Sequence, residues 1–427
     1  MNSPWIFLFF LYKKNVYLCN SFRRQKLLLP TDRQNDIEMK QRRIILSVTN
    51  DLVTDQRVHR SCTALSEAGY DVTLVGRRLP DSVPVERPYK TVRMRLLFRK
   101  KAVFYAEYNL RLFLRLLFSP TDAFYANDTD SLPANYLAAV LRRKPLFFDA
   151  HEMFPEVPEL VGRPRVKRFW TRIEDRIFPR LCRPHRAAVT VCQSIADIYR
   201  NRYGLNMRVV RNVPMTFPKH NDAALQILAS LPQDKRLLLY QGAVNVGRGI
   251  EWVMAAMPYL PECHLVIAGV GDTYLQLKAE AAKQGLKNVT FLGRVEPATL
   301  HGLTAAASLG LSLLENRGLN YYYSLPNRIA DFVQSEVPVL ATDFPEIRRV
   351  VETYGIGTLV EPAPFDVATQ HSTPPDPQRM AQIIRDTLVE WDSLNPDERH
   401  HRFALAAADL TWENDKITLL SQVDTIF

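Results

Sequence analysis

The segment RLLLYQGAVNVGRGIEW (236–252) joins a short apolar run to a helical pattern through a turn that contains Gly242, Gly247 and Gly249. Strand, glycine-rich turn and helix form the repeating unit of parallel α/β sheets. Such a turn can bring backbone N–H groups close to a phosphate, and Arg248 could add a charge-assisted hydrogen bond. The turn matches neither a Walker loop nor G-x-G-x-x-G, so an ordinary strand-to-helix turn remains an alternative.

Strand-like and helix-like segments alternate on both sides of this stretch. The apolar runs predict buried strands at 44–49, 71–76, 123–128, 145–151 and 187–192, and again at 236–242, 264–269, 289–293, 309–314, 338–342 and 357–362. Short apolar strands that alternate with longer helices indicate right-handed βαβ units and mostly parallel sheets. We therefore predict two doubly wound α/β domains, with the ligand in the cleft between them.

Breaks in this alternation set the expected domain limits. We expect a poorly ordered extension at 1–38, an N-terminal domain at 39–215, a C-terminal domain at 216–405, and a helix at 406–427 that packs back towards the first domain. The apolar run Trp5–Tyr12 is too short to span a bilayer, although a short membrane-surface anchor is an alternative. The chain contains no 18-residue apolar stretch, so we predict no transmembrane helix.

The composition is that of a globular protein with a basic excess. Its 427 residues include 55 Lys and Arg against 45 Asp and Glu, a formal net charge of +10. This charge favours an acidic partner without identifying it, and a merely solvated basic face is an equal alternative. The five cysteines are scattered without C-x-x-C, which argues against a disulfide framework or a zinc site and fits the cytosol. Cys62 and Cys192 lie in apolar segments, where we expect core packing.

Two further motifs lie in the second half. VIAGVGD (266–272) runs from a strand into Gly269 and Gly271, and a purely structural turn is its simplest reading. SLPNRIADF (324–332) sets a helix start at Pro326 and Asn327, with Asp331 one turn further on. A helix N-terminus suits a phosphate, and a carboxylate one turn in could accept the hydroxyls of a ribose. A capped amphipathic helix is the alternative.

In the first half, polar residues follow two of the expected strands. His151 comes directly after a strand, with acidic residues on either side, and Glu152 is one of them. A histidine at a strand tip beside acids is a candidate site residue, whereas no second histidine at helical spacing supports a metal centre. The loop after the first strand carries Asn50, Asp51 and Asp55, which we expect to line the cleft; capping of the next helix by Asp55 is the alternative.

Basic and aromatic residues interleave in RKKAVFYAEYNLRLFLRLLF (99–118). Such a helix could dock on an anionic membrane surface. It could equally be a core helix whose arginine stems lie along apolar surface. We favour core packing and keep surface docking by one basic face as the alternative.

From about Met39 onward these motifs together resemble the retaining glycosyltransferases of family 4, in a bacterial subgroup with the GT-B fold. The resemblance rests on SVTNDLVTDQRVHR, FDAHEMFPEVPEL and RNVP in the first half, and on YQGAVNVGRG, VIAGVGD, VTFLGRV, SLPNRIADF and VPVLATDFPEI in the second. It implies that His151 is the active-site histidine that touches the donor sugar. It also implies that Arg248 holds the donor diphosphate, and that Leu325, Asn327 and Arg328 lie at the diphosphate mainly through their backbone. The other donor-binding positions are Leu292 and Gly293 near the base, Asp331 at the ribose, and Gly242 and Gly269 in the glycine-rich turns.

Two departures from the family pattern stand out. The family often carries two basic residues in the glycine-rich loop, where this chain has Ala243 and Arg248. Its paired glutamates are eight residues apart, whereas here the positions hold Tyr323 and Asp331. Glu315 is acidic and nearby, but its spacing does not fit the pair.

The resemblance implies transfer of a sugar from a nucleoside diphosphate sugar to a hydroxyl acceptor, with retention and without a divalent metal or other cofactor. We expect a glycan or lipid-linked acceptor, a cytoplasmic location, peripheral contact with an anionic membrane surface, and no nucleic acid partner. Two alternatives remain: a nucleotide-sugar 2-epimerase on the same fold, and a non-catalytic subunit that binds the nucleotide sugar.

Overall fold

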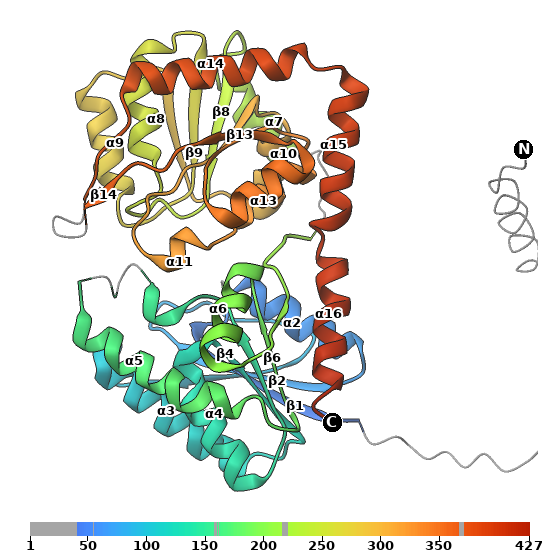
Figure 1. The fold of residues 1–427 in the computed structure, drawn as a ribbon. Coiled ribbons are helices and arrows are strands. Elements are labelled where there is room, and N and C mark those ends of the chain that lie inside the picture. Colours follow the sequence, from blue (N-terminus) through green and yellow to red (C-terminus); the bar gives the residue numbers. More distant parts are fainter. Residues whose placement is uncertain (1–40, 54, 158–159, 161, 216–220, 367–370) are drawn as a thin grey trace, which may run out of the picture. The chain divides into compact units, whose positions relative to one another are not determined.

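A computed structural model describes residues 41–53, 55–157, 160, 162–215, 221–366 and 371–427. The part from Gln41 to Phe427 forms one compact unit, in which Figure 1 shows two lobes, each built around its own sheet. The expectations for residues 1–38, including the Trp5–Tyr12 run, lie outside the described residues.

The N-terminal lobe contains a seven-stranded parallel sheet in the order β3-β2-β1-β4-β5-β6-β7. Because the chain moves outward from β1 to β3 and then returns to β4, the strand order reverses between β1 and β4, where ligands of such sheets bind. The strands are β1 (Arg43–Asp51), β2 (Asp71–Arg78), β3 (Lys90–Arg95), β4 (Ala123–Asn127), β5 (Leu146–Ala150), β6 (Arg186–Thr190) and β7 (Arg208–Val209).

Helices cover both faces of this sheet because successive strand residues point to opposite sides. In β4, Tyr125 packs into the cluster that contains residues of α2, whereas Phe124 packs into the cluster that contains residues of α3, α4 and α6. The helices of this lobe are α2 (Gln56–Glu67), α3 (Lys101–Phe118), α4 (Asp128–Arg142), α5 (Pro164–Ile177) and α6 (Gln193–Tyr203), with 3-10 turns at Phe154–Glu156 and Phe178–Arg180.

The C-terminal lobe contains a six-stranded parallel sheet in the order β10-β9-β8-β11-β12-β13, which reverses between β8 and β11. Its strands are β8 (Arg236–Gln241), β9 (Cys263–Ala268), β10 (Val289–Gly293), β11 (Leu309–Ser312), β12 (Val339–Thr342) and β13 (Gly357–Val360). Its helices are α7 (Asp222–Ala229), α8 (Ile250–Ala256), α9 (Tyr274–Lys283), α10 (Pro297–Ala305), α11 (Leu319–Tyr322), α12 (Asn327–Gln334) and α13 (Pro345–Tyr354), with a 3-10 turn at Met257–Tyr259. The expected fold class of two parallel doubly wound sheets, the GT-B arrangement, is confirmed.

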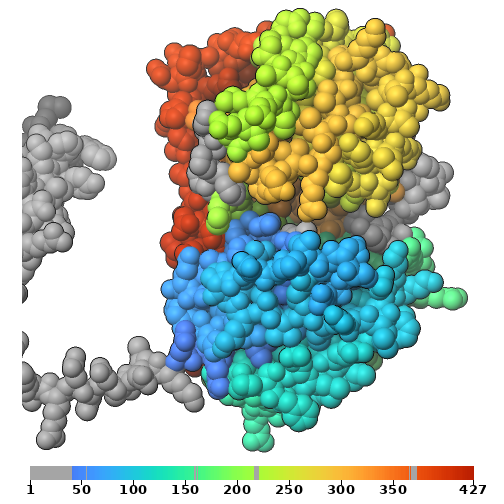
Figure 2. Space-filling model, turned by 180° about the vertical axis from the view of Figure 1, so that it is seen from behind, coloured from blue at the N-terminus to red at the C-terminus, as the bar shows by residue number. Residues whose placement is uncertain are grey.

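Three helices close the chain: α14 (Pro377–Ser393), α15 (Pro396–Asp409) and α16 (Trp412–Asp424). The first two pack on the C-terminal lobe, whereas α16 packs on α2, β6 and β7 of the N-terminal lobe. Figure 1 shows α14 crossing the outer end of the C-terminal lobe, and α15 and α16, in red, running along one side of the two lobes; Figure 2 shows red segments along the same side from behind. Arg211 anchors the crossing point, because its guanidinium lies 2.7 Å from an oxygen of Asp409 and 3.2 Å from an oxygen of Asp415.

Three sequence expectations change in detail. β3 and β7 were not expected, and neither was the short antiparallel pair of β14 (Phe365–Asp366) and β15 (His371–Ser372). Cys62 and Cys192 are buried as expected, and the four cysteines of the described part are free thiols. Within the described residues, no helix combines the length and the apolar character needed to cross a bilayer.

Candidate active site

A cavity of about 890 Å³ opens between the carboxyl edges of the two sheets. This volume lies within the range that protein pockets use to bind nucleotide-sized ligands. Most of the residues expected from the sequence to form the site line it: Asn50, Asp55, His151 and Glu152 from the N-terminal lobe, and Gly242, Arg248, Leu325, Asn327, Arg328 and Asp331 from the C-terminal lobe.

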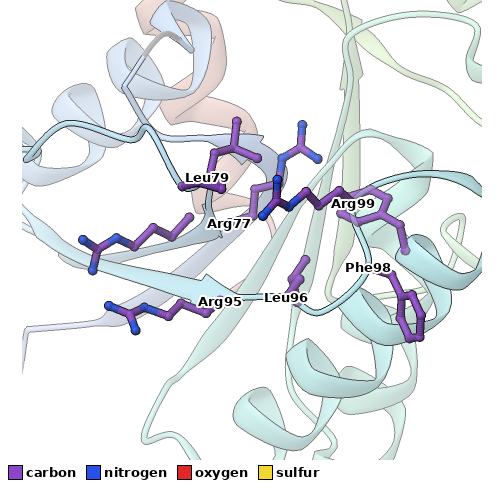
Figure 3. A pocket seen from close by; sticks show the side chains of 9 residues that line it. Arg77, Leu79, Arg95, Leu96, Phe98 and Arg99 are labelled. Carbon is purple, nitrogen blue, oxygen red and sulfur yellow. The ribbon is translucent and has the colours of Figure 1, made fainter.

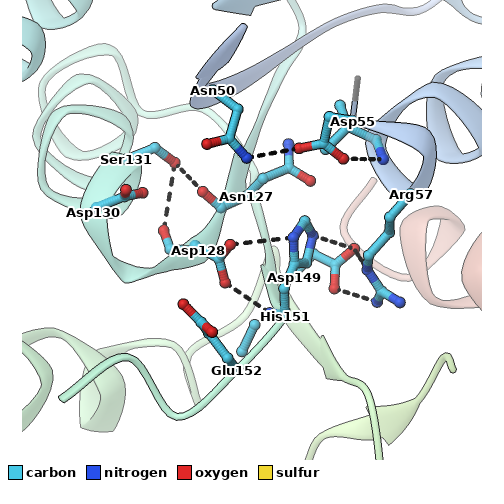
Figure 4. A network of polar contacts seen from close by, with 12 residues as sticks. Asn50, Asp55, Arg57, Asn127, Asp128, Asp130, Ser131, Asp149, His151 and Glu152 are labelled. Carbon is cyan, nitrogen blue, oxygen red and sulfur yellow. Dashed lines mark hydrogen bonds and ion pairs between the residues drawn. The ribbon is translucent and has the colours of Figure 1, made fainter. Parts of the chain in front are cut away.

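His151 follows β5 and is held by Asp128, the residue that follows β4. One oxygen of Asp128 lies 3.1 Å from His151 Nδ1, and the other accepts the backbone N–H of His151 at 2.8 Å (Figure 4). Asp128 has a left-handed backbone conformation (φ 59°), which costs energy for a residue other than glycine. The strained turn therefore fixes both the backbone and the ring of His151.

A buried carboxylate, Asp149, faces the other ring nitrogen, because its Oδ2 lies 3.4 Å from His151 Nε2. Arg57 Nη2 donates a hydrogen bond to Oδ1 of the same carboxylate at 2.6 Å, and the Tyr125 hydroxyl donates to Oδ2 at 2.9 Å. Figure 4 shows His151 and Arg57 on either side of Asp149. Asp149 is thus held between two basic side chains, Arg57 and His151.

Electrostatics fix the protonation of this group. Burial disfavours charge on the imidazole, but Asp128 and Asp149 outweigh burial and raise the pKa of His151 to about 10. Burial likewise opposes ionisation of Asp149, but Arg57 and His151 hold the pKa of that carboxyl well below its usual range. At neutral pH His151 is therefore an imidazolium and cannot accept a proton.

Two arginines of the C-terminal lobe line the opposite wall, and each stacks on a tyrosine. The guanidinium of Arg248 lies 4.8 Å from the ring centre of Tyr321, and that of Arg328 lies 4.4 Å from the ring centre of Tyr240. Stacking holds a guanidinium in place while its N–H edges remain available to a ligand. Nη1 of Arg328 is buried and has no hydrogen-bond partner among the described residues. A buried, unpaired donor of this kind suits an anionic ligand.

Asp331 is oriented by a short relay. Thr304 donates its hydroxyl to Gln241 Oε1 at 2.7 Å, and Gln241 in turn donates its amide to Asp331 Oδ2 at 2.8 Å. This relay leaves the other carboxylate oxygen of Asp331 available to a bound hydroxyl group. Burial raises the pKa of Asp331 to about 6, so that the carboxylate ionises only near neutral pH.

The start of α12 also faces the cavity. Pro326 occupies the N-cap position and Asn327 is the first helical residue, so the Asn327 side chain does not cap the helix. Because a helix start leaves backbone N–H groups without intrahelical partners, this end of α12 can receive an anion.

Four of the expected site residues do not line the cavity. Asp51 points away and pairs with Arg93 at 2.8 Å, so its role is to hold the sheet edge. A Cβ at Gly269 (φ 153°) would lie 1.8 Å from the carbonyl oxygen of Gly242, so Gly269 permits a close backbone approach that shapes the cavity from behind. Leu292 packs against the core, and Gly293 ends β10 next to Tyr274.

Each lobe matches the model of a known protein family. Residues 55–214 match the model of Glycosyltransferase Family 4, and residues 235–388 match that of Glycosyl transferases group 1. The chain belongs to the glycosyltransferases. No curated protein matches it in a sequence search.

Several solved structures share the fold of this glycosyltransferase, although their sequence identity to it is low. Sucrose-phosphate synthase from Thermosynechococcus elongatus is 18% identical with a TM-score of 0.70, over 91% of this chain and 99% of that one. HepE from Anabaena in complex with UDP-glucose is 13% identical with a TM-score of 0.63, over 90% and 99%. WaaG, a glycosyltransferase involved in lipopolysaccharide biosynthesis, is 14% identical with a TM-score of 0.62, over 89% and 99%.

The structure also shows where the residues that depart from the family pattern lie. Tyr323 does not line the cavity; its backbone carbonyl accepts from Cys192 of the N-terminal lobe. Glu315 is buried and pairs with Arg317 at 3.0 Å, outside the cavity lining. The carboxylates among the described residues that do line it are Asp55, Glu152 and Asp331.

Glu152 lies where the lobes of the glycosyltransferase meet. Asn320 of α11 donates its amide to Glu152 Oε2 at 3.3 Å and accepts the backbone N–H of Met153 at 3.0 Å. Asp55 lines the cavity and also caps α2 by accepting the Val58 N–H at 3.1 Å. The two roles that the sequence suggested for Asp55 are therefore compatible.

Sequence analysis did not predict Asp128, Gln241 and Asn320 as contributors to the site, and it placed Arg57 near the cleft without its partner Asp149. Asp128 carried a usable signal, because it directly follows an apolar strand in the same way as His151. Gln241 lies within a strand pattern, where nothing in the local sequence distinguishes a site residue from an ordinary one. No cluster of potential metal ligands occurs among the residues that the structure describes.

Proposed function

We propose that this glycosyltransferase moves a hexosyl group from a nucleoside diphosphate sugar to a hydroxyl acceptor, with retention of the anomeric configuration. The observation that carries the proposal is one cavity that Arg248, Arg328 and Asp331 line together with the charged His151. The C-terminal wall supplies cations for a diphosphate, and the N-terminal wall supplies a fixed histidine.

The donor fits the C-terminal wall by its chemistry. The diphosphate lies between the stacked guanidinium groups of Arg248 and Arg328 and the start of α12. The ribose hydroxyls donate to the free oxygen of Asp331. A second cavity of about 570 Å³ shares Asp331 and includes Val295 and Leu300, just beyond β10, and we assign it to the base. HepE, whose structure contains UDP-glucose, supports a nucleotide sugar as donor.

In the transfer step the bond between C1 of the sugar and the diphosphate oxygen breaks, and the diphosphate leaves with the electron pair. The acceptor oxygen bonds to C1, and its proton passes to the leaving diphosphate. Because negative charge develops on the leaving diphosphate, cations that already point at it lower the barrier. Arg248 and Arg328 supply that charge, so we expect transfer to proceed without an added divalent metal.

His151 acts as a fixed imidazolium in this proposal. His151 lines the cavity, and we assign to it a contact with the donor sugar. Because both ring nitrogens face carboxylates, His151 positions the sugar and does not deprotonate the acceptor.

The acceptor is assigned by chemical class. We propose a glycan or lipid-linked hydroxyl in cell-envelope synthesis, used by a cytoplasmic protein at the inner face of the membrane. WaaG, with the same fold, is involved in lipopolysaccharide biosynthesis, which supports this class.

Proton NMR of the reaction with a panel of nucleoside diphosphate sugars and a lipid extract tests the proposal. We expect loss of the donor anomeric signal, appearance of a product signal with the same configuration, and no effect of EDTA. An inverted product contradicts retention. An epimeric nucleotide sugar formed without acceptor indicates a 2-epimerase, and donor binding without turnover across acceptors indicates a non-catalytic subunit.

A further inference from the structure

A third pocket, of about 240 Å³, lies on the N-terminal lobe at the ends of β2 and β3, and four of its lining residues are arginines. Arg77 and Arg78 end β2, Arg95 ends β3, and Arg99 lies in the loop that leads into α3. Figure 3 shows the side chain of Arg99 extending across the pocket towards Arg77. Within the described residues, no carboxylate forms an ion pair with any of these four arginines.

This arrangement is electrostatically unfavourable without a ligand. Arg78 and Arg95 are aligned in register on neighbouring strands, and like charges in that position repel. Nε of Arg77 is buried and has no hydrogen-bond partner in the part that the structure describes. Repulsion and an unpaired buried donor are both relieved when an anion enters the pocket, so the pocket is built for a negatively charged group.

An exposed apolar surface begins beside the pocket. The side chain of Leu97 is 78% exposed and that of Phe98 is 50% exposed. Both residues are held rigidly, because the Glu107 carboxylate accepts the backbone N–H of Leu97 at 2.9 Å and that of Phe98 at 2.8 Å. The loop therefore presents two apolar side chains to solvent in a fixed conformation, next to the arginines.

The same surface continues along two helices. On α3, Phe104, Tyr108, Leu112 and Leu116 pack into the core, which confirms the expected core packing for one face. The opposite face carries an exposed apolar stripe of Val103, Leu110, Leu114 and Phe118. Arg142 of α4 ties the two helices together by donating to Leu116 O at 2.7 Å, and α4 adds exposed Leu137, Val140 and Leu141.

We propose that this surface, formed by the arginine pocket, the 97–98 loop and the exposed faces of α3 and α4, docks on a membrane containing anionic phospholipids. The phosphate of a lipid headgroup enters the arginine pocket, and the apolar side chains enter the interface. The charge pattern favours this partner, since cations beside exposed apolar side chains match an anionic headgroup layer above acyl chains. The inference rests on the proposed function for the location of the acceptor, but its test requires no transfer.

Co-sedimentation of the full chain with vesicles tests the inference. We expect binding to phosphatidylcholine vesicles that contain 30% phosphatidylglycerol (about a third anionic lipid, enough for the surface charge that attracts basic residues), and little binding to pure phosphatidylcholine. Each basic residue near an anionic surface contributes roughly 5-fold to partitioning, so Arg95→Gln with Arg99→Gln is expected to weaken binding about 30-fold. The matched control, Lys278→Gln with Lys287→Gln, removes two exposed charges from the other lobe and is expected to bind like the wild type.

Two further experiments test the apolar side chains and distinguish a lipid headgroup from free phosphate as the bound anion. Leu110→Ser with Phe118→Ser is expected to weaken vesicle binding while the charge is unchanged. Inorganic phosphate at constant ionic strength is expected not to release the protein. Equal binding to both vesicle types, an unaffected Arg95 and Arg99 variant, or release by phosphate would each overturn the proposal.

Nucleotide affinity distinguishes this inference from the proposed function. The Arg95 and Arg99 variant is expected to bind nucleoside diphosphate as the wild type does. If vesicle binding follows the pattern above while no nucleotide binds, the proposed function fails and the docking surface stands. If nucleotide binds but vesicle binding does not follow that pattern, the docking surface is wrong and the proposed function stands.

Discussion

Asp128 holds His151 twice, with one oxygen 2.8 Å from the backbone nitrogen and the other 3.1 Å from Nδ1 of the ring. Neither contact depends on a ligand, so the histidine is positioned before the donor arrives. Preorganisation of this kind contributes to catalysis because the group does not reorient during the reaction.

The first prediction concerns the charge of His151. Its pKa is raised to about 10, so its ring signals in NMR should not titrate between pH 6 and pH 8. A raised pKa contributes stability that is present below the unfolded value of about 6.5 and is lost as pH rises towards 10. Asp128→Asn is expected to lower the pKa of His151 by about 1–3 units, because burial then opposes the charge with one carboxylate fewer.

Asp175→Asn, an exposed change in α5, serves as the control and should leave the His151 signals unchanged. A His151 signal that titrates near pH 6.5 in the wild type would show that the imidazole is neutral in the site. It could then accept a proton.

The second prediction separates diphosphate from base recognition. Arg328→Ala should weaken binding of the preferred nucleoside diphosphate about 10-fold to 100-fold in calorimetry, because it removes charge-assisted hydrogen bonds. Arg248→Ala should act similarly. Neither change should affect the affinity for the corresponding nucleoside, and Arg294→Ala, an exposed change near the base side, should leave diphosphate binding intact. Equal losses for nucleoside and diphosphate would mean that the arginines support the fold of the site only.

The third prediction concerns the pH dependence of donor binding. Because the pKa of Asp331 is raised to about 6, the carboxylate becomes protonated as pH falls through 6 and loses an acceptor for the ribose. Affinity should therefore fall below pH 6 in the wild type. The terminal phosphate of the nucleotide titrates near the same pH, so the informative quantity is the ratio of wild-type to Asp331→Asn affinity. A ratio that stays constant between pH 5 and pH 8 would remove Asp331 from the binding site.

The fourth prediction concerns stability. Arg57→Met leaves the Asp149 carboxylate buried without its main partner, which typically costs about 3–5 kcal/mol. Denaturant unfolding measures this loss, and the double variant with Asp149→Asn should recover part of it. Since the pKa of Asp149 is depressed, its stabilising contribution in the wild type is present above about pH 4 and is lost as pH falls further. A double variant no more stable than Arg57→Met would show that the pair is not the source of the effect.

The alternation of apolar runs was sufficient to predict the two sheets, because buried parallel strands such as β9 and β12 are apolar throughout. β3 was not predicted because it is an edge strand, and its sequence KTVRMR mixes basic and apolar residues. Its pairing with β2 depends on tertiary context, which local sequence patterns do not contain.

The site was only partly predictable for a similar reason. His151, Arg248 and Asp331 occupy turn or helix-start positions that sequence patterns mark. The residues that tune them, such as Arg57 for Asp149 and Gln241 for Asp331, lie 92 and 90 positions away in the chain. Only the folded arrangement brings these partners together, so neither the imidazolium state of His151 nor the raised pKa of Asp331 could be derived beforehand.

The central claim is that the C-terminal wall of the cavity binds the nucleoside diphosphate sugar. Hydrogen–deuterium exchange with the donor that supports turnover measures this directly. We expect slower exchange at 242–249 and 324–331, the two segments that carry Arg248, Arg328 and Asp331, and unchanged exchange at 95–101 beside the arginine pocket. Donor consumption with no protection at either segment would contradict the account.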